Sequence, residues 1–389
     1  LFMAGFSFTR GTQMLIARSM GGLNLKEVGN IVDTTIIAML AVALLFFGLI
    51  KGFTHEILGF MLTSEEIVQK CEVFLSYRIY GLIPSFISFV FIAFYSGIGR
   101  TPILAASVGV MTFFNIFLNY GLVYGKFGLP QIGIGGSGLA TSISETLAVL
   151  VLFAGTFHKQ RIHDFSLFRF KRFDGKLMLK MGNIAVPLML QSLAAVGAWL
   201  FLFARIETQL GADALAISSI FRQLILFFTI PTWSLGSTAN TVISNLVGQR
   251  DYSGVKDAIW KLSIISIGFA VLSCAVIYLF PQFCIGVFTS KQDTALIPMA
   301  IEILPVIFVV FILMSFSNII FNGVISLGDI YIALGIQVVT VIIYIVYFQV
   351  LFQMPFVNTF WIWTAEWVYW LSILLASLLF FRFKKLDIV

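Results

Sequence analysis

The sequence predicts an all-α polytopic membrane protein, and both its composition and its apolar runs indicate this class. Of the 389 residues, 59% are apolar and only 11% are charged, and the mean hydropathy is +1.01. An ordinary soluble domain carries about 25% charged residues, so this chain lacks the polar surface that a soluble fold needs. The apolar residues form continuous runs of spanning length, about 20 residues, rather than the alternating pattern of a membrane β-barrel. Soluble, disordered and disulfide-rich classes are therefore excluded.

Eleven apolar runs predict eleven spanning helices, and short loops join most of them. The helices are expected near residues 1–20, 28–52, 67–98, 101–124, 134–157, 178–209, 212–247, 257–281, 296–326, 330–353 and 359–381. Four prolines within these runs are expected to kink their helices, because proline removes a backbone hydrogen bond. They are Pro84, Pro187, Pro231 and Pro305.

Lys and Arg are concentrated in alternate loops, and this bias predicts which side faces the cytoplasm. Sixteen of the 24 fall on the side that carries the basic segment 158–180, and five fall on the opposite side. The remaining three, Arg10, Arg78 and Arg222, lie within predicted spans. We therefore expect segment 158–180 and the C-terminus to be cytoplasmic, in a multi-pass protein of the bacterial plasma membrane (the inner membrane).

A weak internal repeat predicts two lobes. Residues 11–32 align without gaps on 238–259, and residues 96–105 align on 325–334, at offsets of 227 and 229. Each offset corresponds to six spans, an even number, so the two copies face the same way about an axis along the membrane normal.

The repeat also predicts the domain boundaries. The helix at 178–209 precedes the second copy, whereas the first copy has no such helix, so we expect one further helix upstream of Leu1 and an N-terminally truncated chain. The intact protein would have two six-helix lobes, and eleven of the twelve spans are present. We expect an N-terminal lobe at 1–157 with five of its six helices, a cytoplasmic linker at 158–180, and a C-terminal lobe of six helices at 181–389.

Several segments resemble, in order, the multidrug and toxic compound extrusion (MATE) family of efflux transporters. GTQMLIARSMGGLNLKEVG is similar to the family's second-helix signature, and SNLVGQRDYSGVKDA is similar to its counterpart in the second lobe. YRIYGLIPSFISFVFIAFYSGIGRTPILA and NIFLNYGLVYGKFGLPQIGIGGSGLATSIS resemble the fourth-to-fifth and fifth-to-sixth helix blocks. The resemblance covers essentially the whole chain. It implies a secondary active antiporter that exports amphipathic, cationic organic compounds by alternating access.

The coupling ion implied by the resemblance is Na⁺ or H⁺, and no other cofactor is expected. Asn115 and Asn119 are the first candidates, because residues four apart share one helix face and membrane-buried amides need partners. Thr141, Ser144 and Glu145 follow on the next helix. The structural alternatives are interhelical hydrogen bonds for the amides, bonds to their own helix for the hydroxyls, and an ion pair with Arg78 or Arg222 for Glu145.

Four residues are candidates for the substrate path. Arg78, Arg222 and Gln223 lie within predicted spans, where a polar group marks a possible cavity. Glu366 lies in WIWTAEWVYW, where an acid among aromatic rings would attract cationic compounds. The alternatives are anchoring of the lobe by Arg78, snorkelling of Arg222 to the interface, and an interfacial aromatic belt around Glu366.

Other functions are not supported by the sequence. The run Gly133–Gly138 reads G-x-G-x-x-G, but it opens a membrane helix instead of a βαβ unit, so we interpret it as a close-packing surface. No nucleophile–base pair, metal triad or Walker A sequence indicates an enzyme. We expect small organic substrates, membrane lipid around the chain, no nucleic acid, and a monomer. The alternative function is a lipid-linked oligosaccharide flippase of similar two-lobed architecture, which would need several cleft cations to bind a diphosphate.

Overall fold

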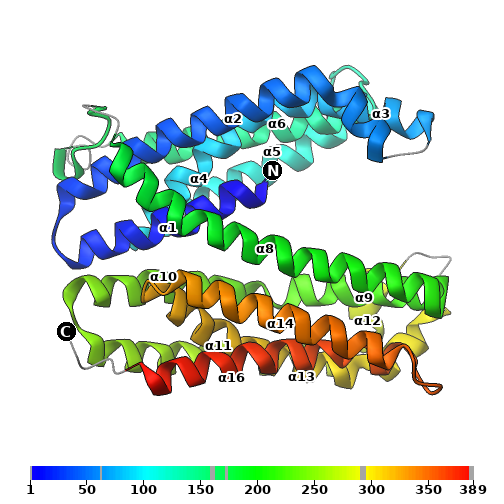
Figure 1. Ribbon diagram of the computed structural model, residues 1–389. Helices are drawn as coiled ribbons and strands as arrows, with labels where there is room; N and C mark the ends of the chain where they lie inside the picture. The colour runs from blue at the N-terminus through cyan, green and yellow to red at the C-terminus, as the bar shows by residue number, and fades with distance from the viewer. Residues whose placement is uncertain (1, 62–63, 158–162, 171–173, 290–294, 385–389) are drawn as a thin grey trace. The chain divides into compact units, whose positions relative to one another are not determined.

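The computed structural model describes residues 2–61, 64–157, 163–170, 174–289 and 295–384, and no β-strand occurs among them. The chain divides into two compact units, Leu1–Val186 and Pro187–Val389 (Figure 1). The division lies inside one long helix, α8 (Gly175–Leu210), a few residues after the predicted start of the C-terminal lobe. The predicted linker at 158–180 falls partly outside the described residues and stays a prediction.

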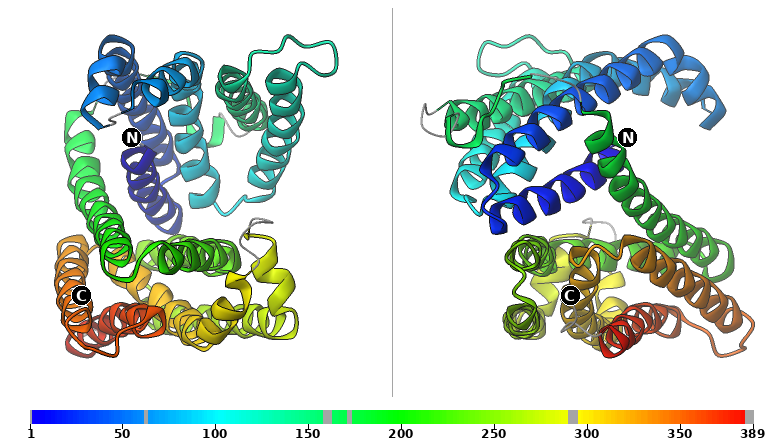
Figure 2. Two further views of the ribbon diagram at one scale, coloured as in Figure 1. Left: turned by 90° about the vertical axis from the view of Figure 1, so that its right-hand side faces the viewer. Right: turned by 60° about the vertical axis from the view of Figure 1, so that its left-hand side comes forward.

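The first unit is a bundle of α-helices (Figures 1 and 2). Its helices pack pairwise along their lengths, and α6 contacts α3, α4 and α5. The elements are α1 (Phe2–Gly21), α2 (Leu25–Met61), α3 (Glu65–Arg78), the short 3₁₀ turn η1 (Ile79–Gly81), α4 (Leu82–Gly97), α5 (Pro102–Tyr124) and α6 (Ile134–Thr156), followed by the start of α8.

The second unit is also helical, and α13 packs against α10, α11 and α16 (Figure 1). Together with the remainder of α8, it contains α9 (Ala212–Phe228), α10 (Ile230–Gln249), α11 (Tyr252–Leu279), α12 (Pro281–Gly286), α13 (Leu296–Ser326), α14 (Ile330–Leu351), α15 (Thr359–Trp363) and α16 (Ala365–Phe383). Its apolar core includes Trp363 and Phe311, which are fully buried.

Nine helical segments of the described chain are long and apolar enough to cross a membrane, and a tenth span results if the bent pair α9–α10 is counted. The predicted count of eleven is not confirmed. Residues 1–20 do form a helix, but α1 carries Arg10 and Arg18 among its Thr, Gln and Ser residues and is less apolar than the other ten segments. The helix expected upstream of residue 1 stays a prediction.

The second unit repeats the order of elements in the first, as the aligned segments predict. Helix α1 ends at Gly21 and α10 at Gln249, an offset of 228 residues. Helices α2 and α11 begin at Leu25 and Tyr252, an offset of 227 residues. The close agreement of these offsets with the sequence repeat indicates that both units are built on one helical pattern.

One of the four predicted proline kinks is a clear break. Helices α9 and α10 meet at an angle of 47°, and Pro231 is the second residue of α10. Proline has no N–H to continue the preceding helix, and its ring disfavours the α conformation just before it. Pro187 and Pro305 instead lie inside α8 and α13, which each continue as a single helix.

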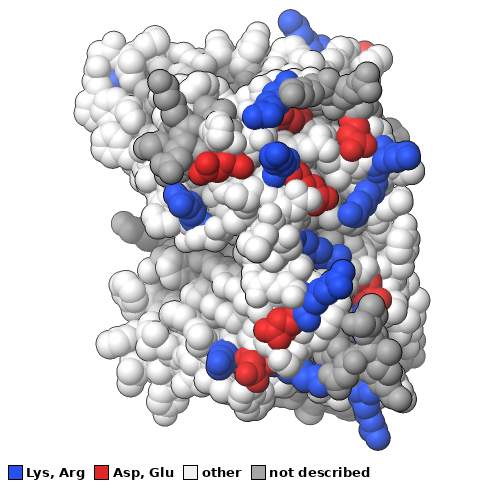
Figure 3. All heavy atoms as spheres, turned by 90° about the vertical axis from the view of Figure 1, so that its left-hand side faces the viewer, with Lys and Arg blue, Asp and Glu red and all other residues white. Residues whose placement is uncertain are grey.

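Charged side chains gather at one end of the helices within each unit. Figure 3 looks onto the ends that carry the α1–α2 and α10–α11 turns, where Lys and Arg alternate with Asp and Glu. Asp251 caps α11 there and accepts a hydrogen bond from the Gly254 N–H at 2.9 Å. This backbone bond, with help from the Ser253 hydroxyl, lowers the pKa of Asp251.

Candidate functional site

A bidentate ion pair in the first unit joins Arg78 and Glu145. Two parallel hydrogen bonds run from the guanidinium to the carboxylate, from Nη1 to Oε2 at 2.8 Å and from Nη2 to Oε1 at 2.7 Å. The two side chains are only 15% and 17% exposed. Their pairing on α3 and α6 lets two opposite charges remain inside a bundle of spanning helices, since each neutralises the other.

Hydroxyl groups from two neighbouring helices complete this cluster. Ser85 on α4 donates to Glu145 Oε2 at 2.5 Å. Ser142 lies on α6, one helical turn before Thr146. Its hydroxyl lies within hydrogen-bond distance of the Tyr77 and Arg78 carbonyl oxygens, at 3.1 and 3.2 Å. The cluster therefore ties α3, α4 and α6 together.

The glycine run at the start of α6 makes this approach possible. A Cβ atom at Gly138 would lie 2.6 Å from the Phe74 carbonyl oxygen, and one at Gly136 would lie 2.6 Å from the Leu122 carbonyl oxygen. Any side chain at either position would push α3 or α5 away from α6. The interpretation of this run as a close-packing surface is therefore supported by the geometry.

The second polar cluster is a two-step ladder between α5 and α6. The Asn115 amide donates to Thr141 Oγ1 at 3.2 Å, and the Asn119 amide donates to Ser137 Oγ at 3.3 Å. Thr141 in turn donates to the Ser137 carbonyl at 2.9 Å. Both amides are half-buried, in a helix whose other faces are largely exposed.

Ser144 does not join this ladder. It is fully buried, and its hydroxyl donates to the Ala140 carbonyl of its own helix at 2.7 Å. Of the five predicted coupling residues, Asn115, Asn119 and Thr141 therefore lie in the polar contacts between α5 and α6. Glu145 lies in the ion pair with Arg78, and Ser144 is bound to its own helix.

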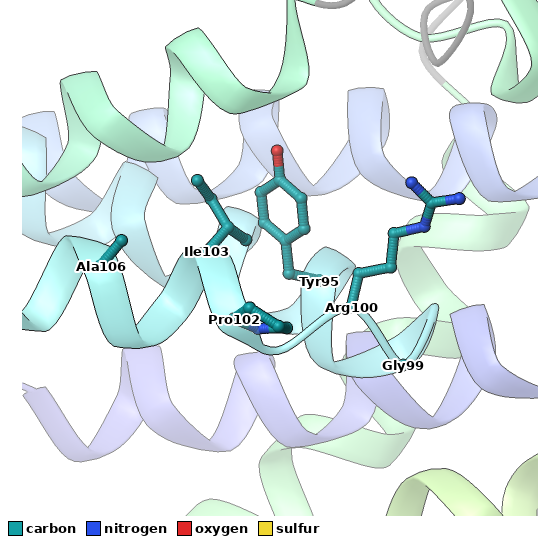
Figure 4. Close-up of a pocket in the computed structure, with 6 residues that line it drawn as sticks. All are labelled: Tyr95, Gly99, Arg100, Pro102, Ile103 and Ala106. Carbon is teal, nitrogen blue, oxygen red and sulfur yellow. The ribbon is translucent and has the colours of Figure 1, made fainter.

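An open cavity of about 610 Å³ lies at the turn between α4 and α5. Figure 4 shows the side chains of Tyr95 and Ile103 directed to the same side as the extended Arg100, with Pro102 at the start of α5. The Tyr95 hydroxyl lies 2.8 Å from Thr156 Oγ1 and is fully buried, so its polar end is already engaged with α6. Nothing in the sequence marks this cavity, because no polar pattern is needed to form it.

A buried carboxylate anchors the described part of the predicted linker. Asp33 on α2 is 6% exposed and accepts three backbone N–H bonds, from Phe168 at 2.9 Å, Arg169 at 2.8 Å and Phe170 at 3.0 Å. Gly29, one turn earlier, leaves room for the Phe165 and Ser166 carbonyls. The partners are 135 or more residues apart, so local sequence patterns do not reveal the contact.

The second unit places Arg222 and Gln223 at different levels of burial. The Arg222 guanidinium lies 5.5 Å from the centre of the Phe203 ring, a cation–π contact. Gln223 is exposed on the next position of α9. Arg222 is in the unit that does not contain Glu145, so of the two predicted partners of Glu145 the structure shows Arg78.

Glu366 is buried, whereas the aromatic-belt interpretation expected it at an interface. It is 3% exposed, at the start of α16. Its Oε1 atom accepts hydrogen bonds from Trp199 Nε1 at 2.7 Å and from the Tyr344 hydroxyl at 3.0 Å. The surrounding rings come from α8, α14 and α15, which close over the carboxyl group.

A third polar cluster, between α10 and α13, was missed. Asn318 donates to the Thr232 carbonyl at 2.9 Å, and Asn322 donates to the Asn318 carbonyl at 2.7 Å. The hydroxyls of Thr232 and Ser315 lie 3.1 Å apart. The signal was available, because Asn318 and Asn322 have the same four-residue spacing as Asn115 and Asn119.

Comparison with known sequences matches the chain to a protein family and to relatives in several bacteria. The model of the MatE family matches residues 1–121 and 187–350. "Probable multidrug resistance protein YoeA" of Bacillus subtilis is 27% identical over 312 residues, which cover 76% of this chain and 65% of the relative. "Probable multidrug resistance protein NorM" of Thermotoga maritima is 26% identical over 73% of this chain and 60% of the relative. The chain thus spans about two thirds or less of the length of these curated relatives.

Solved structures share the fold. An outward-facing conformation of a multidrug resistance MATE family transporter superimposes with a TM-score of 0.88 at 16% identity, over 100% of this chain and 86% of that chain. A MOP superfamily transporter from Pyrococcus furiosus, described as having a binding pocket of reverse polarity, gives the same score, identity and coverage. The family match covers most of the chain in both units, and the spanning helices and the fold agree with it: the chain belongs to the MatE family.

Proposed function

We propose that the protein is a secondary active antiporter of the bacterial plasma membrane that exports amphipathic, cationic organic compounds in exchange for Na⁺ or H⁺. The observation that carries this proposal is the family match, which extends over both compact units. Relatives from two bacteria bear names as multidrug resistance proteins, and this supports drug-like substrates. The protein acts as a transporter without chemical conversion of its substrate, and it works as a monomer with a cytoplasmic C-terminus.

The polar groups inside the spanning helices support coupling to a cation. The Asn115–Thr141 and Asn119–Ser137 contacts supply neutral oxygen and amide groups at two successive levels of α5 and α6. Oxygen ligands of this kind suit a hard cation such as Na⁺. The Arg78–Glu145 pair is less suited to this role, because the carboxylate is already neutralised by two charge-assisted hydrogen bonds.

The contacts of two of the three arginines within the predicted spans weaken the flippase alternative. A protein that moves a lipid-linked diphosphate needs cations available to the phosphates, preferably as bidentate arginine contacts. Arg78 is engaged with Glu145, and Arg222 lies over the Phe203 ring. Aromatic and aliphatic surface with few polar contacts instead suits loosely specific recognition of organic cations.

Ethidium efflux from proteoliposomes tests the proposal. The protein from the full reading frame is reconstituted, and an Na⁺ gradient at fixed pH is compared with a proton gradient in the absence of Na⁺. Efflux under one of the two gradients is the expected result, and if that gradient is the Na⁺ gradient, Asn115→Ala is expected to reduce efflux. Folded protein that moves ethidium under neither gradient, but translocates a lipid-linked diphosphate, would reverse the choice between the two functions.

A further inference from the structure

Glu366 carries a buried carboxyl group in the second unit and belongs to neither of the polar clusters of the first unit. It lies in the spanning segment Thr359–Phe383 and is 3% exposed. An ionised carboxylate in an apolar membrane interior is costly unless an opposite charge or a proton neutralises it. An ionisable residue in such a position points to a functional site. Its carboxylate can be neutralised by a basic side chain, an organic cation, a metal ion or a proton.

Among the residues that the structure describes, no Lys, Arg or His forms an ion pair with Glu366. The nearest arginine of α8, Arg205, donates to Gln349 at 3.2 Å and lies over the Phe352 ring. Arg222 of α9 is engaged with Phe203. Neither guanidinium is directed at the carboxylate.

The groups that face Glu366 are neutral donors. They are Trp199 from α8 and Tyr344 from α14, at 2.7 and 3.0 Å from Oε1, and the Trp370 side chain one turn further along α16. The other titratable neighbour is Tyr369 on α16 itself, whose hydroxyl accepts a 2.8 Å bond from Gln337. The titratable groups around the carboxyl are thus two phenols, and neither supplies a positive charge.

The packing around Glu366 leaves no room for a large cation. Ile362, Trp363 and Ala365 are fully buried beside it, and Tyr344 is 1% exposed. An organic cation would need a cavity of several hundred Å³ here. A metal ion would need several oxygen ligands, whereas the indole N–H of Trp199 is a donor only and already bonds one of the two carboxylate oxygens, Oε1. A proton needs neither a cavity nor further ligands.

We infer that Glu366 carries the proton in the exchange cycle, an inference that rests on the antiport function proposed above. The carboxylate takes one proton from water on one side of the membrane, forming one O–H bond, and returns that proton to water on the other side. In the ionised state, the hydrogen bonds from Trp199 and Tyr344 stabilise the negative charge. Because those donors belong to α8 and α14, the protonation state of Glu366 on α16 biases how the three helices pack together.

Glu366→Gln is the test variant, because a glutamine has nearly the same volume and its carbonyl oxygen still accepts the two hydrogen bonds. Efflux of ethidium driven by a proton gradient should fall at least tenfold. Exchange of radiolabelled for unlabelled ethidium at equilibrium, which moves no net proton, should stay within about twofold of wild type. The matched control is Glu302→Gln, an exposed glutamate of α13 in the same unit, which should leave both rates unchanged.

A spectroscopic readout separates a proton carrier from a merely structural group. Infrared difference spectra on ethidium binding should contain a carboxyl C=O band that is present in wild type and in Glu302→Gln but absent in Glu366→Gln. Proton-driven efflux at the wild-type rate in Glu366→Gln, or equal loss of efflux and exchange in folded protein, would overturn the inference. So would wild-type efflux driven by Na⁺ alone. If the wild-type protein moved ethidium under neither the proton gradient nor the Na⁺ gradient, that result would instead contradict the proposed antiport function.

Discussion

The Arg78–Glu145 pair offers the most quantitative test of how this bundle tolerates charge. Arg78→Met removes the guanidinium and leaves Glu145 with the Ser85 hydroxyl as its remaining neighbour in the cluster. Breaking a buried ion pair by removing one partner costs about 3–5 kcal/mol, because the other charge stays buried. Since the two side chains retain 15% and 17% exposure, we expect the lower end, about 3 kcal/mol. This corresponds to an unfolding constant about 150-fold larger.

The double variant Arg78→Met/Glu145→Gln should recover much of this loss. With both charges gone, no uncompensated ion remains, so the two single effects should differ from additivity by about 2 kcal/mol. The assay is equilibrium unfolding in mixed detergent micelles, followed by far-ultraviolet circular dichroism, because all seven tryptophans lie in the second unit. The control cycle uses Lys70→Met and Glu66→Gln, an exposed i,i+4 pair on α3 whose side chains are 61% and 76% exposed. That pair should show a coupling of about 0.5 kcal/mol or less. Additive effects at Arg78 and Glu145 would show that the two charges do not stabilise each other.

Three further changes should each disturb one contact. Gly138→Val should lower the unfolding midpoint strongly, since its Cβ would lie 2.6 Å from the Phe74 carbonyl oxygen, whereas the same change at the unhindered Gly109 should be mild. Asp33→Ala removes the acceptor of three backbone N–H groups. Each hydrogen bond to a charged group contributes about 1.5 kcal/mol, so tryptic cleavage after Arg169 should become about tenfold faster or more. An unchanged cleavage rate would show that Asp33 does not hold this segment. The lowered pKa of Asp251 means that its stabilisation is present above about pH 4 and is lost as pH falls through the native pKa, so Asp251→Asn should flatten the acid limb of a midpoint-against-pH profile.

The sequence predicts the helices well because the bilayer imposes a simple rule on length and polarity. The second-unit run near 330–353 and α14 (Ile330–Leu351) agree within two residues at each end. The rule fails where a helix is polar, as in α1, or where one run contains a break, as at Thr229 before Pro231. Hydropathy averages over such breaks, so the bent pair α9–α10 reads as a single span.

The polar clusters were predicted only in part, because spacing reveals a shared helix face but not the partner across it. The four-residue spacing placed Asn115 and Asn119 together, and their partners Thr141 and Ser137 lie on α6 as neighbours of α5. The sequence left two partners open for Glu145, and only the packing of α3 on α6 selects Arg78. The burial of Glu366 depends on Trp199 of α8, 167 residues away, as well as on Tyr344 of α14, 22 residues away. Local sequence shows neither contact, so the Trp-rich segment was interpreted as an interfacial belt.

The most direct test of antiport is counter-movement of the coupling ion with no ion gradient imposed. Proteoliposomes loaded with ethidium, and containing lumenal pH and Na⁺ indicators, are diluted into dye-free buffer of identical pH and Na⁺ concentration. If the protein is an antiporter, ethidium leaving the lumen drives H⁺ or Na⁺ into it, and an ionophore for the coupled ion accelerates dye release. If ethidium left the lumen at the same rate with and without the ionophore, and neither indicator responded, the protein would be a passive carrier and not an antiporter.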